Sequence, residues 1–398
     1  MSAMLSLAEA QTRLLAGIVP LAPEKLPVVE ATGRFLAEPL IAARTQPAAD
    51  LSAMDGYAVR QHERGPWRII GESSAGHPFD RAVGAGEAVR ISTGAQMPDG
   101  ADAVLLQENA IREGNILALN GEGEPTARHI RRAGFDFRTG DELLPEGVRI
   151  GAGQLALAIA AGRNTLVVGR LPRIAIIDSG DELSSDPSAC SIHQIPASNG
   201  PMLAALCKPH AADVLRIGPV ADDLAALRDA LEQAADCDVI VTSGGASVGD
   251  HDLVKPALEA WGAEIDFWKV AMKPGKPLLV ARKDARTILG LPGNPVSSFV
   301  TGFLFLLPLL RALAGSGAPL PTPIMLPCGC DLPAGGARLE FLRARMADGA
   351  VHAVQQQDSS ALLALARSNA LIERAAGAPA VKAGTPVPAY LLETGGIA

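Results

Sequence analysis

The chain has 398 residues, enough for two to four domains at roughly 150 residues each. Its 35 Lys+Arg stand against 43 Asp+Glu, and the resulting charge of −8 opposes a nucleic-acid-coating role, because such binding needs a basic face. Hydrophobic residues make up 48% of the chain, and its Gly and Pro content stays below that of disordered proteins, so there is material for more than one folded core.

Cysteine use and hydropathy indicate the cellular compartment. The 5 cysteines are odd in number and include no CxxC pair, which opposes a disulfide framework and favours a reducing environment. Charged residues come too early in the N-terminal segment for a signal-peptide core. The most apolar stretch, 288–310, is interrupted by glycines and prolines, and its unbroken part falls far short of the roughly 20 residues that span a bilayer. We therefore expect a cytoplasmic protein that spans no membrane.

The first part of the chain predicts a β-rich module inserted into a helical linker domain. Ser6 and Glu9 form a capping box that predicts an N-terminal helix. Short apolar runs between turn residues then predict strands. A helical pattern at 153–160 would rejoin the N-terminal segment. The predicted domains are a discontinuous helical domain, 1–42 plus 141–170, and an inserted β-rich domain, 43–140.

Residues 171–318 alternate buried-type strands with helical patterns, which predicts an α/β layer whose parallel sheet is covered on both faces. The predicted strands are 173–178, 214–217 and 238–242, and the predicted helices are 201–207, 222–235 and 252–261. A proline-rich linker leads to a small C-terminal β domain, 319–398, with a turn at Asp348-Gly349. The predicted fold class is therefore α/β plus β in a multidomain chain.

Ligands of such sheets bind at the carboxyl ends of the strands, so the loops after residues 178, 242 and 290 are the first candidate sites. The second loop, 243–252, is glycine-rich and leads into a helix, which suits a phosphate; the alternative is a plain turn with Asp250 or Asp252 as N-cap. In the third loop, Asn294 fits an N-cap and Pro295 the first helical position, while the prolines also fix the loop rigidly beside the sheet.

Charged residues near these loops suggest an anionic ligand. Lys269, Lys273 and Lys276 lie in a proline-restricted segment and form either a solvated basic turn or an oxyanion cradle. Carboxylates at strand ends and helix starts suit a Mg²⁺-assisted phosphate site, although Asp222 is most simply an N-cap. These carboxylates are Asp181, Glu182, Asp222, Asp250 and Asp252. In the β module, Asp55 and Thr93 precede glycines and are also typical of turns.

Eight strings taken together resemble the molybdopterin molybdenumtransferase family, the molybdenum-insertion enzymes of molybdenum cofactor synthesis. In family order they are SAMDGYAV (52–59), STGAQMPDGADAV (92–104), HIRRAGFDF (129–137), SGDEL (179–183), SNGPML (198–203), TSGGASVGDHD (242–252), KPGKP (273–277) and GLPGNPVSS (290–298). They cover most of residues 50–300; the N-terminal helix and 319–398 match in pattern and length only.

The resemblance implies an elongated, four-part subunit with a central molybdopterin-binding-like α/β domain. It implies a homodimer whose cleft lies between the α/β domain of one subunit and the β module of the other. The implied reaction converts adenylylated molybdopterin and molybdate, with Mg²⁺, to molybdenum cofactor and AMP. The implied protein partners are molybdopterin adenylyltransferase and apo-molybdoenzymes.

The resemblance also implies residue roles, carried over by motif position. Catalytic roles fall on Asp55, Thr93, Glu182, Asp252, Lys269, Lys273 and Lys276. Ligand-binding roles fall on Ser179, Gly180, Ser243, Gly244, Gly245, Ser247, Pro292, Pro295 and Asp136. Metal-binding roles fall on Glu182, Asp181, Asp222 and Asp252, with Asp223 the alternative to Asp222 at that helix start.

Two positions depart from the family pattern. Ser179 stands where Thr is common, which keeps the hydroxyl. Phe135 stands where an acid is usual, which lowers the negative charge around Asp136.

Two other functions remain open at this point. A molybdopterin adenylyltransferase uses a related α/β domain and a similar SGG loop, but it is usually one compact domain. A non-catalytic scaffold would bind pterin and pass it on. ATP consumption with unadenylylated molybdopterin would favour the first, and tight pterin binding without AMP release would favour the second.

Overall fold

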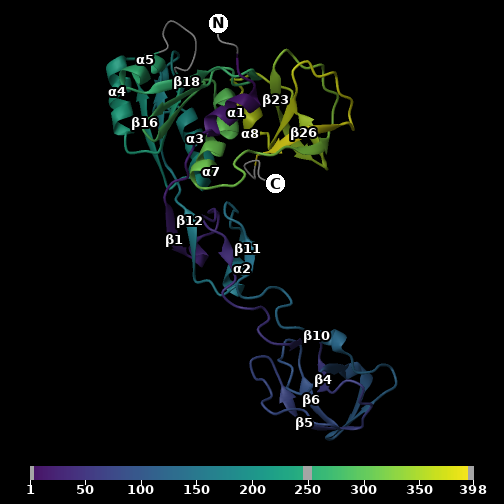
Figure 1. Ribbon diagram of the computed structural model, residues 1–398. Helices are drawn as coiled ribbons and strands as arrows, with labels where there is room; N and C mark the ends of the chain where they lie inside the picture. Colours follow the sequence, from purple (N-terminus) through teal and green to yellow (C-terminus); the bar gives the residue numbers. More distant parts are fainter. Residues whose placement is uncertain (1–3, 245–252, 393–398) are drawn as a thin grey trace.

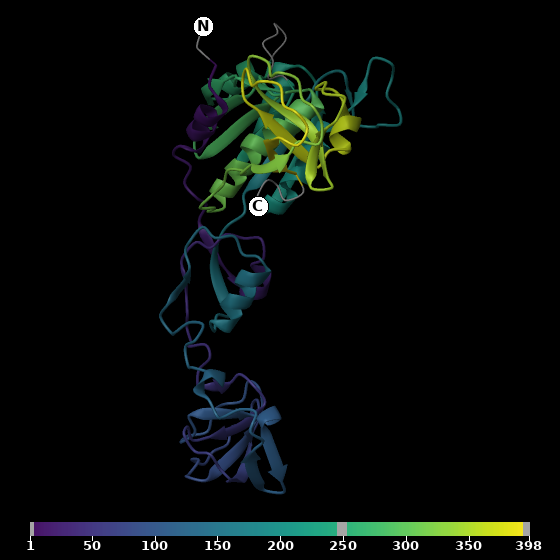
Figure 2. The same ribbon diagram turned by 90° about the vertical axis from the view of Figure 1, so that its right-hand side faces the viewer.

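The computed structural model describes residues 4–244 and 253–392. The molecule is elongated (Figure 1), with the α/β and C-terminal domains together at one end and the inserted β module at the other. A small middle domain separates them, and the view turned by 90° shows the same arrangement (Figure 2). The two ends of the molecule that carry predicted site residues are therefore far apart within one subunit.

The inserted module is a six-stranded sheet in the order β7-β4-β6-β5-β9-β8, with a short β3–β10 pair beside it. Its strands alternate apolar side chains that fill two small clusters around Val89 and Trp67. The strands are β3 (Leu51–Ser52), β4 (Gly56–Val59), β5 (Trp67–Ser73), β6 (Glu87–Ile91), β7 (Ala103–Leu106), β8 (Ala110–Glu113), β9 (Ile116–Leu119) and β10 (Ile130–Arg131).

The middle domain joins two distant stretches of chain. Strand β1 (Pro23–Pro27) pairs antiparallel with β12 (Thr165–Gly169), and β2 (Leu40–Ile41) pairs with β11 (Glu142–Leu144). Helix α2 (Ala152–Ala160) completes its core. The capping box at Ser6 and Glu9 is confirmed at the start of α1 (Leu7–Leu15), which packs on the α/β domain through buried Leu14 rather than on α2. The domain limits expected from the sequence stay a proposal.

The α/β domain holds a six-stranded sheet in the order β16-β13-β17-β21-β20-β18. Four of these strands, β16, β13, β17 and β21, are parallel, as expected, whereas β20 and β18 run antiparallel to their neighbours. The strands are β13 (Arg173–Ser179), β16 (Asp213–Val220), β17 (Val239–Ser243), β18 (Glu264–Trp268), β20 (Leu279–Lys283) and β21 (Arg286–Leu291).

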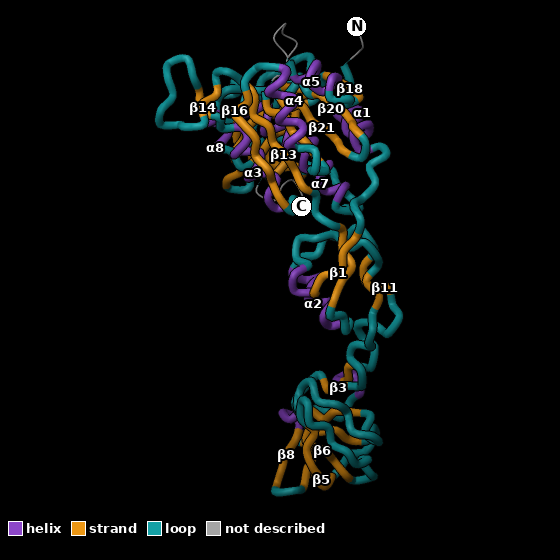
Figure 3. Tube along the Cα trace, turned by 90° about the vertical axis from the view of Figure 1, so that its left-hand side faces the viewer, coloured by secondary structure: helices purple, strands orange, loops and turns teal. Residues whose placement is uncertain are grey.

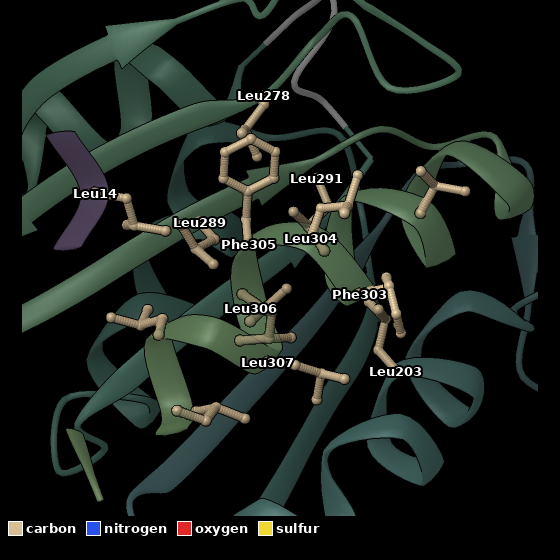
Figure 4. Packing of buried hydrophobic residues seen from close by; sticks show 14 of the residues in the cluster. Leu14, Leu203, Leu278, Leu289, Leu291, Phe303, Leu304, Phe305, Leu306 and Leu307 are labelled. Atoms are coloured by element: carbon tan, nitrogen blue, oxygen red, sulfur yellow. The ribbon is translucent and has the colours of Figure 1, made fainter. Parts of the chain in front are cut away.

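Helices cover both faces of this sheet, which confirms the layered prediction (Figure 3). On one face α4 (Leu224–Gln233) and α5 (Val254–Ala260) pack through residues such as Leu227 and Leu258. On the other face lie α1, α3 (Asn199–Cys207), α6 (Pro295–Thr301) and α7 (Leu307–Leu313), around the large apolar cluster of Figure 4.

The cap of α4 corrects one prediction. Asp223 is the N-cap, since its Oδ1 accepts the N–H of Ala225 at 2.9 Å and of Ala226 at 3.0 Å. The interpretation of Asp222 as the cap is wrong because it lies one residue too early to reach those amides. Asp222 is thereby left on the loop that leads into the helix.

The most apolar segment forms one helical run, because a π-helical turn at Gly302–Leu306 joins α6 to α7. This run, Pro295–Leu313, is long and apolar enough to cross a membrane, but 89% of its apolar window is buried inside the protein, as expected of a core helix. Pro308 does not end it. Because Pro308 has no N–H, the carbonyl of Leu304 needs another donor, and the buried Gln11 Nε2 donates to it at 2.9 Å.

The C-terminal domain is a sheet in the order β19-β23-β25-β26-β22, in which β24 also pairs with β23. The turn at Asp348-Gly349 is confirmed between β23 and β24. Strand β19 (Met272–Lys273) comes from the α/β domain and pairs with β23, which fixes the two domains together. The other elements are β22 (Ile324–Pro327), β23 (Leu339–Ala347), β24 (Ala350–Ala353), α8 (Leu362–Ala366), β25 (Ala370–Arg374) and β26 (Pro386–Leu391).

Two short strands, β14 (Leu183–Ser184) and β15 (Ile195–Pro196), flank a projecting loop of the α/β domain.

Candidate active site

A cavity of about 790 Å³ opens at the carboxyl ends of β13, β17 and β21, where the sequence places its candidate loops. Its size is in the usual range for small-molecule sites. The structure brings eight of the predicted residues to its lining: Ser179, Gly180, Glu182, Asp222, Ser243, Gly244, Pro292 and Pro295.

The strand register explains why these residues meet. Strands β13 and β17 are parallel neighbours, and Asp178 lies opposite Ser243. The two following loops run so close that a Cβ on Gly244, whose φ is +103°, would lie 2.5 Å from the Ser179 carbonyl oxygen. Only glycine fits there, and this explains why the first glycine of the SGG string is needed.

Two residues of the cavity lining carry buried hydroxyl groups. The Oγ atoms of Ser179 and Ser243 are buried and have no hydrogen-bond partner within residues 4–244 and 253–392. Buried polar atoms are nearly always paired in native proteins, so each hydroxyl is expected to have a partner outside those ranges or in a bound molecule.

Three carboxylates gather on one side of the cavity. The Asp222 N–H donates to Asp181 Oδ1 at 3.1 Å. Partial burial raises the pKa of Asp222, and the negative charges of Asp181 and Glu182 raise it further, against the lowering effect of a hydrogen bond from the Asp181 backbone. These hard oxygen ligands suit Mg²⁺, which keeps several waters and needs few carboxylates. In the described ranges, however, no group of three or more His, Cys, Asp or Glu residues is placed so that it could hold a metal ion together.

Two of the three predicted lysines line a cavity. Lys273 and Lys276, together with Arg338, line a second cavity of about 690 Å³, which shares Pro277 and Asn294 with the first. Lys273 Nζ lies 3.2 Å from Glu340 Oε1 of the C-terminal sheet. Lys269, whose backbone is left-handed at φ 84°, does not occur among the described residues that line either cavity.

The predicted residues of the β module lie away from both cavities, in the distant lobe of Figure 1. Asp55 Oδ1 accepts the N–H of Thr93 at 2.7 Å, and hydrogen bonds from Thr93 lower the pKa of Asp55. Asp136 is exposed between β10 and β11, where that module joins the middle domain. The predictions for Gly245, Ser247 and Asp252 fall on residues outside the described part of the chain.

The sequence analysis missed several lining residues. Asp178, only 4% exposed, lies in the first cavity at the end of β13. Burial raises its pKa to about 6, against the opposing effects of Arg216 and of a hydrogen bond from the Gly200 N–H. Ser360 and Leu362 of the C-terminal domain also line this cavity. An acid that ends an apolar strand was the available signal for Asp178, whereas no local pattern marks the other two.

The fold and the site define an α/β enzyme with hydroxyl, carboxylate and ammonium groups around a cleft for an anionic small molecule. Three family models match in succession: "MoeA N-terminal region (domain I and II)" over residues 5–162, "Probable molybdopterin binding domain" over 175–312 and "MoeA C-terminal region (domain IV)" over 325–392.

Full-length relatives agree with these matches. A molybdopterin molybdenumtransferase of Haemophilus influenzae is 35% identical over 318 residues, which cover 78% of each chain. One of Staphylococcus aureus is 32% identical and covers 90% of this chain and 89% of its own. A crystal structure of the molybdopterin biosynthesis moeA protein from Pyrococcus horikoshii matches 98% of this chain and 100% of its own, with a TM-score of 0.84 and 26% identity. The chain belongs to the molybdopterin molybdenumtransferase family.

Proposed function

We propose that this chain inserts molybdenum from molybdate into adenylylated molybdopterin, releasing AMP and forming molybdenum cofactor. The observation that carries the proposal is the pair of adjoining cavities, because one suits a phosphorylated organic ligand and the other a small oxyanion. They meet at Pro277 and Asn294, so two substrates bound in them would be neighbours.

The first cavity would hold the pterin and its phosphates. The hydroxyls of Ser179 and Ser243, for which the described residues offer no partner, would donate to ligand oxygens. The second cavity would hold molybdate, since Lys273, Lys276 and Arg338 outnumber the acids Glu340 and Asp358 of its lining and supply directed N–H groups for a dianion. Fixed donors of this kind stabilise charge without reorganising during reaction, so they supply much of the catalysis.

The carboxylates would hold Mg²⁺. One or two of Asp181, Glu182 and Asp222 would supply oxygen ligands, and waters and substrate oxygens would complete the shell; Asp252, outside the described residues, is a further candidate. When bound, Mg²⁺ would neutralise the adenylyl phosphate and favour attack on phosphorus by water or by a molybdate oxygen. Glu182, which lines the cavity, would hold the adenylyl phosphate in position through the bound ion.

A homodimer would complete the site. Asp55 and Thr93 are held together in the β module, far from the cavity of their own subunit. In a two-fold dimer the same module is offered to the partner, so these residues and Asp136 would face the partner's cleft. We place the enzyme in the cytoplasm, between molybdopterin adenylyltransferase and the apo-molybdoenzymes that receive the cofactor.

The test mixes purified protein with adenylylated molybdopterin, molybdate and Mg²⁺ and follows both AMP release and reconstitution of an apo-molybdoenzyme. Both should depend on molybdate, and Glu182→Gln should lower both by about 100-fold or more, as expected for loss of an electrostatic group at the reacting centre. Asp186→Asn, an exposed acid on the projecting loop, is the matched control and should retain activity.

Three outcomes contradict the proposal. Near-wild-type turnover by Glu182→Gln would remove this residue from the mechanism. ATP consumption with unadenylylated molybdopterin would favour an adenylyltransferase. Tight pterin binding without AMP release would favour a scaffold.

A further inference from the structure

The part of the first cavity formed by the ends of β13 and β17, called its floor below, carries a carboxylate that the mechanism above does not use. Asp178 is the penultimate residue of β13, is 4% exposed and lines the cavity. It lies opposite Ser243 in the parallel register, and the buried Ser243 Oγ also lacks a partner in the described part of the chain. The Asp178 carboxylate and the Ser243 hydroxyl are therefore neighbours in the cavity lining, where the two parallel strands end.

The start of α3 holds this carboxylate in place. A Cβ on Gly200 would lie 2.0 Å from Asp178 Oδ2, so the carboxylate packs directly on the Gly200 backbone, whose N–H donates to it. Asn199 Nδ2 donates to the Gly293 carbonyl at 2.6 Å, which ties this helix start to the loop before α6. The oxygens of Asp178 therefore have a fixed position on the cavity floor.

The carboxylate of Asp178 restricts which chemical groups of a ligand can lie beside it. Ionised, it only accepts hydrogen bonds, and it repels a phosphate brought beside it. The ligand group on this floor must instead offer N–H or O–H donors. Two adjacent donors are the best match, because a carboxylate accepts two parallel hydrogen bonds.

We propose that Asp178 recognises the donor edge of the pterin ring, accepting hydrogen bonds from its ring N–H and its 2-amino group. The phosphates then lie away from the floor, toward the cavity mouth and the lysines. This inference rests on the proposed function, because it takes the pterin as occupant of the first cavity. Adenine, the other ring of the substrate, offers an amino group flanked by acceptors and matches a carboxylate less well.

The experiment compares two probes on the full-length protein: pterin, and lumazine, in which a carbonyl replaces the 2-amino group. Fluorescence titration should show that the wild-type chain prefers pterin by about tenfold or more, as expected for a hydrogen bond to a charged group. Asp178→Asn and Asp178→Ser should lose this preference. Asp186→Asn should keep it, and AMP affinity should stay unchanged in all variants.

Three results would overturn the inference: an unchanged preference in both Asp178 variants, no wild-type binding of pterin at millimolar concentration, or loss of AMP affinity instead of pterin preference. The last would assign the carboxylate to adenine. Molybdate-dependent AMP release, measured on the same wild-type preparation, separates the two claims. If AMP is released by the wild-type protein but the Asp178 substitutions leave the preference for pterin over lumazine unchanged, only the assignment of Asp178 fails.

Discussion

Replacing Asp178 with Asn should stabilise the protein at neutral pH and have much less effect in acid. Burial raises the pKa of Asp178 from 3.8 to about 6. The pKa of Asp178 is higher in the folded than in the unfolded protein. The contribution of this residue to the stability of the wild-type chain is therefore largest at low pH, where its carboxyl group is neutral. The wild-type chain loses stability as pH rises through about 4 to 6, by about 3 kcal/mol in all. Asn keeps an acceptor for the Gly200 N–H and does not titrate.

The assay is thermal unfolding of both proteins across this pH range, taken as a difference so that shared titrations cancel. The midpoint of the variant should rise relative to wild type with increasing pH, at about 2–4 °C per kcal/mol for a domain of this size. A difference that stays constant with pH would refute the reasoning, since it would mean that the carboxyl has the same pKa folded and unfolded. A stabilised variant would also show that any lost pterin preference is not caused by unfolding.

Three further changes test other parts of the structure. Gln11→Leu leaves the buried Leu304 carbonyl without its donor and should lower the free energy of unfolding by about 1–3 kcal/mol, measured by denaturant titration; no change would contradict this role of the side chain. Lys276→Met should weaken molybdate binding by about tenfold in calorimetry, whereas Lys25→Met, in the middle domain, should not; equal effects would argue against the second cavity. Gly200→Ala should displace the carboxylate it contacts and abolish the preference for pterin over lumazine, and an unaffected preference would contradict the close packing.

The layered domain and its loops were predictable because they depend on local patterns. Buried parallel strands have continuous apolar runs, and their carboxyl ends meet at one edge, so Ser179 and Ser243 could be placed together from the sequence. The helix cap was missed by one residue, because Asp222 and Asp223 are both good capping residues and only the backbone angles decide between them.

Other features depend on contacts between distant segments. Asp178 is typical of a strand end, and its place on the cavity floor follows from the packing of α3 against β13. Ser360 reaches the first cavity because β19 pairs with β23 and fixes the C-terminal sheet beside it. The helical run through Pro308 depends on Gln11, which lies nearly three hundred residues earlier in the chain. No local pattern carries such information.

The most direct test of the central claim is subunit complementation of molybdate-dependent AMP release. Asp55→Asn and Glu182→Gln chains, each inactive alone, are coexpressed with different tags and mixed dimers are measured with the parents. If the site combines the β module of one subunit with the cleft of the other, each mixed dimer has one intact site, and an equal random mixture should recover about a quarter of wild-type activity. If both residues act within one subunit, every site carries a substitution and the mixture should stay inactive.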